Sequence, residues 1–145
     1  MGLEQHFIRR QTSDRMKTTT TWVADHQFIS QQEGQRISID GNLKEGMSPK
    51  ALLLSGIAGC SGIDVVDILQ KMRVSFTRLE VDASAEQTEE HPRVFTDIQL
   101  IFKADFPAGE EDKFRKAIEL SLEKYCGVAA MLRKNSSIDY RIERF

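Results

Sequence analysis

The alternation of apolar and polar residues divides the first part of the chain into short strands. In residues 35–40, Ile37 and Ile39 fall on one face of an alternating segment, as expected of a half-buried strand. Residues 18–24 are rich in β-branched and aromatic side chains, which also favour a strand. With a further strand at 27–31 and a turn at Glu33-Gly34, the pattern predicts an antiparallel meander.

A long apolar helix is expected next, from Pro49 to about Met72. Ser48 is a suitable N-cap, and proline is favoured at the first position of a helix. Apolar residues nearly encircle this segment, which is typical of a helix buried at the centre of a fold. They are Leu52, Leu53, Leu54, Ile57, Ile63, Val65, Val66, Ile68 and Leu69.

The remaining residues predict strands and helices in turn. The expected elements are strands 76–85 and 93–104, helices 110–125 and 127–134, and a last strand 138–145. Because helices and strands are only partly interleaved, the fold class is α+β, with antiparallel sheets and a long buried central helix. We expect one domain over residues 17–145, preceded by an extension at 1–16. A small domain covers so apolar a helix poorly, so we expect an obligate, intertwined homodimer.

Composition excludes several functions. The 145 residues carry 20 basic and 22 acidic side chains, a balance that gives no support for nucleic-acid binding. No uninterrupted apolar run approaches the roughly 20 residues of a membrane span, and no secretory signal is visible, so we expect a cytoplasmic protein without a membrane partner. His6, His26 and His91 do not cluster with the cysteines, and no phosphate-binding loop is present. We therefore expect no metal and no cofactor.

The candidate chemistry lies in the two cysteines, Cys60 and Cys126. Buried cysteines that never meet would be small hydrophobic residues, whereas a pair in the cytoplasm is more often free, catalytic or redox-sensing. Glycines recur every third residue around Cys60, which indicates close approach of another backbone or a ligand. Cys60 is too far from the helix start for the helix dipole to activate it, so a cation must do so. Arg36 and Arg93 are the candidates.

Three segments resemble the OsmC/Ohr family, the osmotically inducible protein C and organic hydroperoxide resistance proteins. The first is SPKALLLSGIAGC at 48–60, continued by IDVV at 63–66. The others are EHPRVF at 90–95 and YCGVAAML at 125–132. The likeness covers residues 18–145. Within the family, the chain resembles a less characterised, OsmC-like branch.

The resemblance implies a thiol-dependent peroxidase for organic hydroperoxides, built as a swapped α+β homodimer with active sites at the subunit interface. Cys60 would attack the peroxide, Cys126 would resolve it as a disulfide, and a dithiol would reduce that disulfide. We expect Ile57, Ile63 and Lys50 to contact the substrate.

Two positions depart from the peroxidase pattern. Those members carry a glutamate directly after the motif proline, where this chain has Lys50. They also carry an arginine in the N-terminal strands, for which Arg36 is the available residue. The alternative hypothesis is a non-enzymatic protein of the same fold that binds a small apolar molecule or senses redox state.

Overall fold

The computed structural model describes residues 15–145, which form two compact units, one ending at Pro49 and one running from Lys50 to Phe145. The expected extension at 1–16 lies outside the described residues except for Arg15 and Met16. All the buried apolar residues of the described chain belong to the second unit. That residues 17–145 form one domain stays a prediction.

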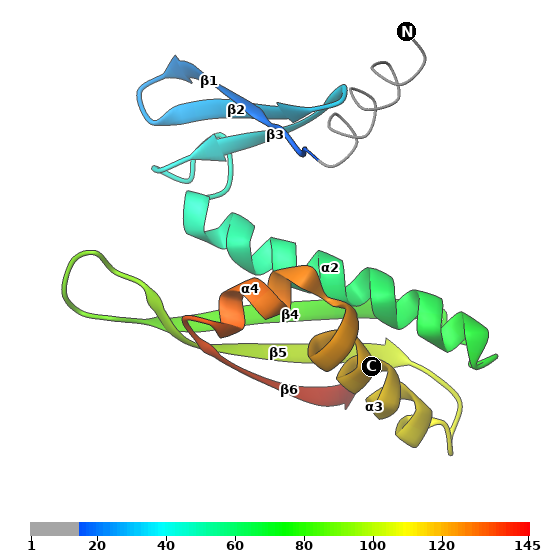
Figure 1. Ribbon diagram of the computed structural model, residues 1–145. Helices are drawn as coiled ribbons and strands as arrows, with labels where there is room; N and C mark the ends of the chain where they lie inside the picture. Colours follow the sequence, from blue (N-terminus) through cyan, green and yellow to red (C-terminus); the bar gives the residue numbers. More distant parts are fainter. Residues whose placement is uncertain (1–14) are drawn as a thin grey trace, which may run out of the picture. The chain divides into compact units, whose positions relative to one another are not determined.

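The first unit contains the antiparallel meander that the sequence predicts (Figure 1). Phe28 pairs with Trp22 on one side and with Ile39 on the other. Trp22, Phe28 and Ile37 remain exposed, so the meander leaves apolar surface open. Its strands are β1 (Thr19–Ala24), β2 (Gln27–Gln32) and β3 (Gln35–Asp40).

The chain after β3 turns back against that strand at Gly46, and this close approach gives a stability prediction. A Cβ atom at Gly46 would lie 2.5 Å from the Ser38 carbonyl oxygen. We expect Gly46→Ala to lower the free energy of unfolding of this unit by about 1–3 kcal/mol. Urea titration followed by the fluorescence of Trp22, the one tryptophan in the chain, measures it. Gly41→Ala is the control, since its Cβ would approach His26 no closer than 3.4 Å. Equal losses in the two variants would contradict the prediction.

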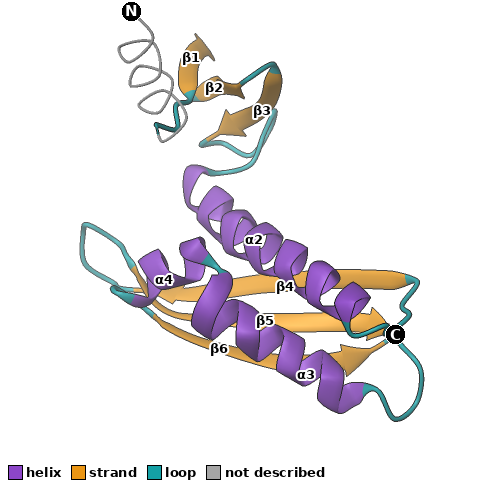
Figure 2. Ribbon diagram, turned by 45° about the vertical axis from the view of Figure 1, so that its right-hand side comes forward, coloured by secondary structure: helices purple, strands orange, loops and turns teal. Residues whose placement is uncertain are grey.

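The second unit is a three-stranded sheet with its helices on one face (Figures 1 and 2). This arrangement confirms the α+β class. The π-helical turn η1 interrupts the segment in which the sequence predicted one continuous helix from 110 to 125. The elements are α2 (Pro49–Lys71), β4 (Arg78–Gln87), β5 (Phe95–Asp105), α3 (Glu111–Leu120), η1 (Ser121–Tyr125), α4 (Gly127–Arg133) and β6 (Ser137–Arg144).

The sheet of the second unit is mixed, which corrects the expectation of antiparallel sheets. β4 pairs with β5 antiparallel, but β6 pairs with β5 parallel, with Leu100 opposite Tyr140. The physical reason is the long connection between β5 and β6, which contains three helical segments. Such a crossover returns the chain to the end of the sheet where β5 began, so the next strand runs in the same direction.

α2 buries one stripe against the core rather than most of its surface. Its buried residues recur every fourth position and are Ile57, Ser61, Val65 and Leu69. On the other faces Leu53 is 48% and Ile63 is 66% exposed, so a single chain leaves α2 partly uncovered. By length and composition alone α2 would suffice to cross a bilayer, contrary to the sequence expectation, but core helices of soluble proteins meet the same criterion.

Candidate functional site

Cys60 lies in the middle of α2, at the edge of its buried stripe. The side chain is partly exposed and packs against the core of the second unit. The neighbouring Gly59 has no atom within 4 Å of the position a Cβ would take. The glycine stripe is therefore not explained by close packing at Gly59 within the described chain, and it leaves the surface beside Cys60 open.

Cys126 lies between the π-helical turn and α4. Its backbone N–H donates to the Ser121 carbonyl at 2.7 Å, the wide spacing that defines a π turn. Cys126 is the N-cap residue of α4, and its Sγ accepts a hydrogen bond from Ala129 N at 3.3 Å. The residue is buried, with 3% of its surface exposed.

The fold places the two thiols near one another. Cys60 lies close enough to the Cys126 thiol to raise its pKa. Both cysteines are free in this structure. Cys60 and Cys126 are therefore neighbours in the structure, and their roles as a redox pair stay a prediction.

Burial raises the pKa of the Cys126 thiol to about 11. The Ala129 N–H opposes this shift, because it stabilises the thiolate, while Cys60 and the Asp64 carboxylate raise the pKa further. The start of a helix normally favours a thiolate, but α4 is short, and desolvation outweighs its one N–H donor. Cys126 is therefore protonated at neutral pH.

This raised pKa predicts a measurable loss of stability in alkali. The unfolded thiol, with a pKa near 9, ionises before the folded thiol does, so the contribution of Cys126 is complete below pH 9 and is lost as the pH rises toward 11. We expect the unfolding free energy of the wild-type protein to fall more steeply between these values than that of Cys126→Ala. Urea titrations at several pH values measure the slopes, and equal slopes would contradict the prediction.

Asp64 and Ser121 also belong to the site, although neither was predicted from the sequence as a site residue. Asp64 follows Cys60 by four residues and so lies on the same side of α2. The Ser121 hydroxyl donates to Asp64 Oδ2 at 2.9 Å. The available signals were the spacing from Cys60 and a serine within the apolar stripe of the expected helix.

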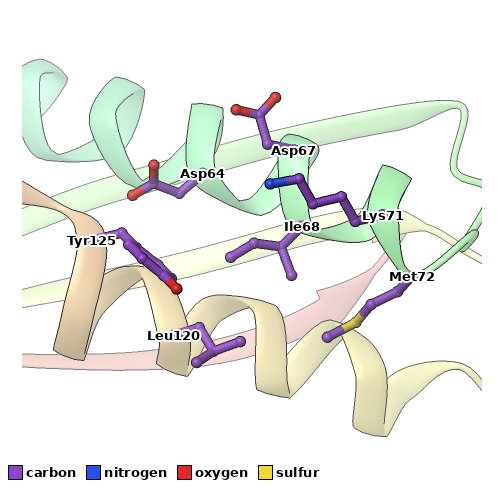
Figure 3. A pocket seen from close by; sticks show the side chains of 7 residues that line it. All are labelled: Asp64, Asp67, Ile68, Lys71, Met72, Leu120 and Tyr125. Atoms are coloured by element: carbon purple, nitrogen blue, oxygen red, sulfur yellow. The ribbon is translucent and has the colours of Figure 1, made fainter.

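A cavity of about 520 Å³ opens next to Asp64. Figure 3 shows residues of α2 on one side and Leu120 and Tyr125 on the other. The cavity is lined by apolar side chains (Ile68, Met72 and Leu120) and by charged ones. The lining residues that α2 provides are Asp64, Asp67, Ile68, Lys71 and Met72. In residues 15–145 no three potential ligand side chains gather into a metal site.

The cationic side chains expected at the site are Lys50, Arg36 and Arg93. Arg93 is exposed, and its Nε donates to the Glu89 carbonyl oxygen at 3.4 Å. Lys50 occupies the first turn of α2, about 15 Å along the helix from Cys60 at the usual rise per residue. Its Nζ donates to Gln87 Oε1 at 2.6 Å, so it does not contact Cys60 of its own chain. Arg36 is exposed on β3, where it pairs with Gln31. Its activating role stays a prediction.

The two isoleucines expected at the substrate differ in exposure. Ile57 has no exposed surface and belongs to the hydrophobic core, so it supports α2 from within and offers no contact to a substrate. Ile63 is 66% exposed, three residues after Cys60 on α2. Ile63 is therefore the one of the two that can meet an incoming molecule.

Comparison with known proteins now identifies the family. The family model described as OsmC-like protein matches residues 40–141, which includes both cysteines. The chain belongs to the OsmC-like family. Protein YhfA of Escherichia coli K12 is 38% identical to this OsmC-like chain over 130 residues, which cover 88% of the chain and 97% of YhfA.

Solved structures share the OsmC-like fold. A hypothetical protein from Aquifex aeolicus VF5 is 27% identical with a TM-score of 0.77, over 90% of this chain and 98% of that one. The organic hydroperoxide resistance protein OhrB of Bacillus subtilis is 12% identical with a TM-score of 0.64, over 89% of this chain and 98% of OhrB. The likeness to OhrB concerns the fold alone.

Proposed function

We propose that this protein is a thiol-dependent peroxidase that reduces organic hydroperoxides with Cys60 and Cys126, as part of a defence against oxidative stress. The observation that carries the proposal is the proximity of a partly exposed thiol to a buried one. Membership of the OsmC-like family supports it, as does the fold shared with a protein described as conferring organic hydroperoxide resistance.

The reaction follows from the chemistry of two neighbouring thiols. The Cys60 sulfur attacks one oxygen of the hydroperoxide, the O–O bond breaks, and the other oxygen leaves with a proton as the alcohol. Cys60 is then a sulfenic acid. The Cys126 sulfur displaces the hydroxyl group from Cys60, and water leaves as the disulfide forms. A dithiol reductant restores both thiols by exchange with that disulfide.

Exposure assigns the two roles. The attacking sulfur must meet a substrate from outside, and Cys60 is the more exposed of the two thiols. Cys126 is almost wholly buried and needs to reach only its neighbour. The resolving role therefore suits Cys126.

We further propose that the protein works as a homodimer. Exposed apolar side chains on α2, such as Ile63 and Leu53, and on the meander, such as Trp22, form surfaces that monomers rarely leave in water. A partner subunit would cover these side chains. It would also supply the cation that activates Cys60, because Lys50 of the same chain lies about 15 Å from Cys60 along α2 and donates to Gln87. Arg36 of either subunit is the candidate.

The test is rapid mixing of the reduced protein with cumene hydroperoxide or with hydrogen peroxide. We expect a burst of hydroperoxide consumption that matches the protein concentration. It should be faster for the organic compound, since the exposed Ile63, three residues after Cys60 on α2, offers an apolar contact. Absence of a burst with either oxidant would overturn the proposal.

A second candidate function is binding or redox sensing without turnover. The cavity beside Asp64 and the lysine at the position of the usual glutamate favour it. Native mass spectrometry of protein purified from cells would then show a retained small molecule. An empty protein that consumes hydroperoxide would exclude this candidate.

A further inference from the structure

Close to the two thiols, α2 and the π-helical turn are joined through a buried serine. The Ser121 hydroxyl donates to Asp64 at 2.9 Å and lies 3.5 Å from the Ser61 carbonyl oxygen. Both serines have no exposed surface, whereas Asp64 is partly exposed at the cavity. A hydrogen bond to a carboxylate is stronger than one between neutral groups.

Ser121 is also bonded to the backbone of Cys126. Its carbonyl oxygen accepts the Cys126 backbone N–H at 2.7 Å. The next carbonyl of the turn, that of Leu122, accepts from Arg133 Nη2 at 2.9 Å. The turn is therefore held by α2 at one point and by α4 at another, and π turns of this kind are frequent at functional sites.

We propose that Asp64 is the positioning residue of the thiol pair: through Ser121 it holds the turn that presents Cys126 to Cys60. The proposal deepens the proposed peroxidase function, and rests on it for its catalytic meaning. Asp64 acts through Ser121 and through its charge, and it is not assigned a contact with the substrate.

The second step uses both the sulfur and the proton of the Cys126 thiol. Because the thiolate is the nucleophile, the S–H bond of Cys126 breaks as its sulfur bonds to the sulfur of the Cys60 sulfenic acid. The S–O bond breaks at the same time, and the proton from Cys126 joins the departing hydroxide to give water. The raised pKa of Cys126 agrees with this role, and Asp64 is one of its causes.

The charge is tested by titrating Cys126 in a Cys60→Ser background, using the ultraviolet absorbance of the thiolate. A variant that lacks both cysteines serves to subtract the tyrosines. Ionisable groups around Asp64 are Asp67 and Lys71 on α2, Tyr125 on η1, and the two cysteines. We expect Asp64→Asn to lower the midpoint by about half a pH unit or more. Asp67→Asn, which removes a charge one turn further along the same cavity, should leave it unchanged.

The positioning is tested without peroxide, by equilibrating each reduced protein with glutathione buffers. Ser121→Ala keeps the charge but loses the hydrogen bond, and we expect the Cys60–Cys126 disulfide to become about three- to tenfold less favoured against the glutathione mixed disulfide. If Asp64→Asn folds poorly, Asp64→Glu is titrated as well. Because it keeps the charge, it should show the wild-type midpoint for Cys126. The proposal is overturned if Asp64→Asn leaves the Cys126 midpoint in place, or if Ser121→Ala leaves the disulfide equilibrium in place. Because neither measurement contains a hydroperoxide, a failure of the peroxidase proposal would appear separately.

Discussion

Serine in place of Cys60 is expected to abolish the burst of hydroperoxide consumption. Cys60 is the more exposed thiol of the pair, and a serine hydroxyl at neutral pH is a far weaker nucleophile than a thiolate. We expect the rate to fall on the order of 10³-fold or more, as when a covalent nucleophile is removed. Stopped-flow assays with cumene hydroperoxide measure it.

The matched control for Cys60→Ser is Ser55→Ala, an exposed position five residues earlier on α2. It should keep the wild-type burst. A burst that survives in Cys60→Ser would mean that Cys126 or another group attacks the peroxide, and the assignment of roles from exposure would be wrong.

Replacement of Cys126 is expected to separate the two steps. Cys60 can still attack the hydroperoxide, so the first burst should remain, but no thiol is left beside the sulfenic acid. We expect complete loss of the intramolecular disulfide and capture of Cys60 by dimedone, a reagent that reacts with sulfenic acids. Mass spectrometry of the labelled protein measures both.

Two variants are needed for this test because Cys126 is buried. Cys126→Ser places a hydroxyl in an apolar site and should cost about 1–3 kcal/mol of stability if the hydroxyl finds no partner. Cys126→Ala avoids that cost, so a result shared by both variants reports on chemistry. Full dimedone resistance in both would contradict the account.

Most of the secondary structure follows from the order of residues. Ser48 and Pro49 predicted the start of α2, and the alternation in residues 35–40 predicted β3, because capping and periodicity are local properties. The direction of β6 was not predictable in this way. It depends on where the crossover returns the chain, and the antiparallel expectation was wrong.

The site was predictable only in part. The resemblance of the two cysteine motifs implied that the thiols meet, and the fold places Cys60 close enough to raise the pKa of Cys126. The π turn was not expected, because an apolar stripe in residues 110–125 looks the same whether one extra residue is inserted or not. In that turn the Ser121 carbonyl oxygen accepts the backbone N–H of Cys126. The contact between Ser121 and Asp64 joins two distant segments, so it could be recognised only from the structure.

Lys50 shows a different limit of sequence reasoning. Its place in the motif suggested a contact with substrate or thiolate, but ten residues of straight helix separate it from Cys60, and Gln87 binds its ammonium group. Distance along a helix is easily worked out from the sequence, whereas the partner of a long side chain is not. Arg36 and Arg93 are therefore the candidates for the cation that activates Cys60.

The most direct measurement is disulfide mapping after the reduced protein receives one equivalent of cumene hydroperoxide. Digestion without reductant and mass spectrometry should show the peptides of Cys60 and Cys126 joined within one chain, with an equal amount of cumyl alcohol released. A protein that stays fully reduced, or one in which Cys126 remains a free thiol while hydroperoxide is consumed, would contradict the two-cysteine account.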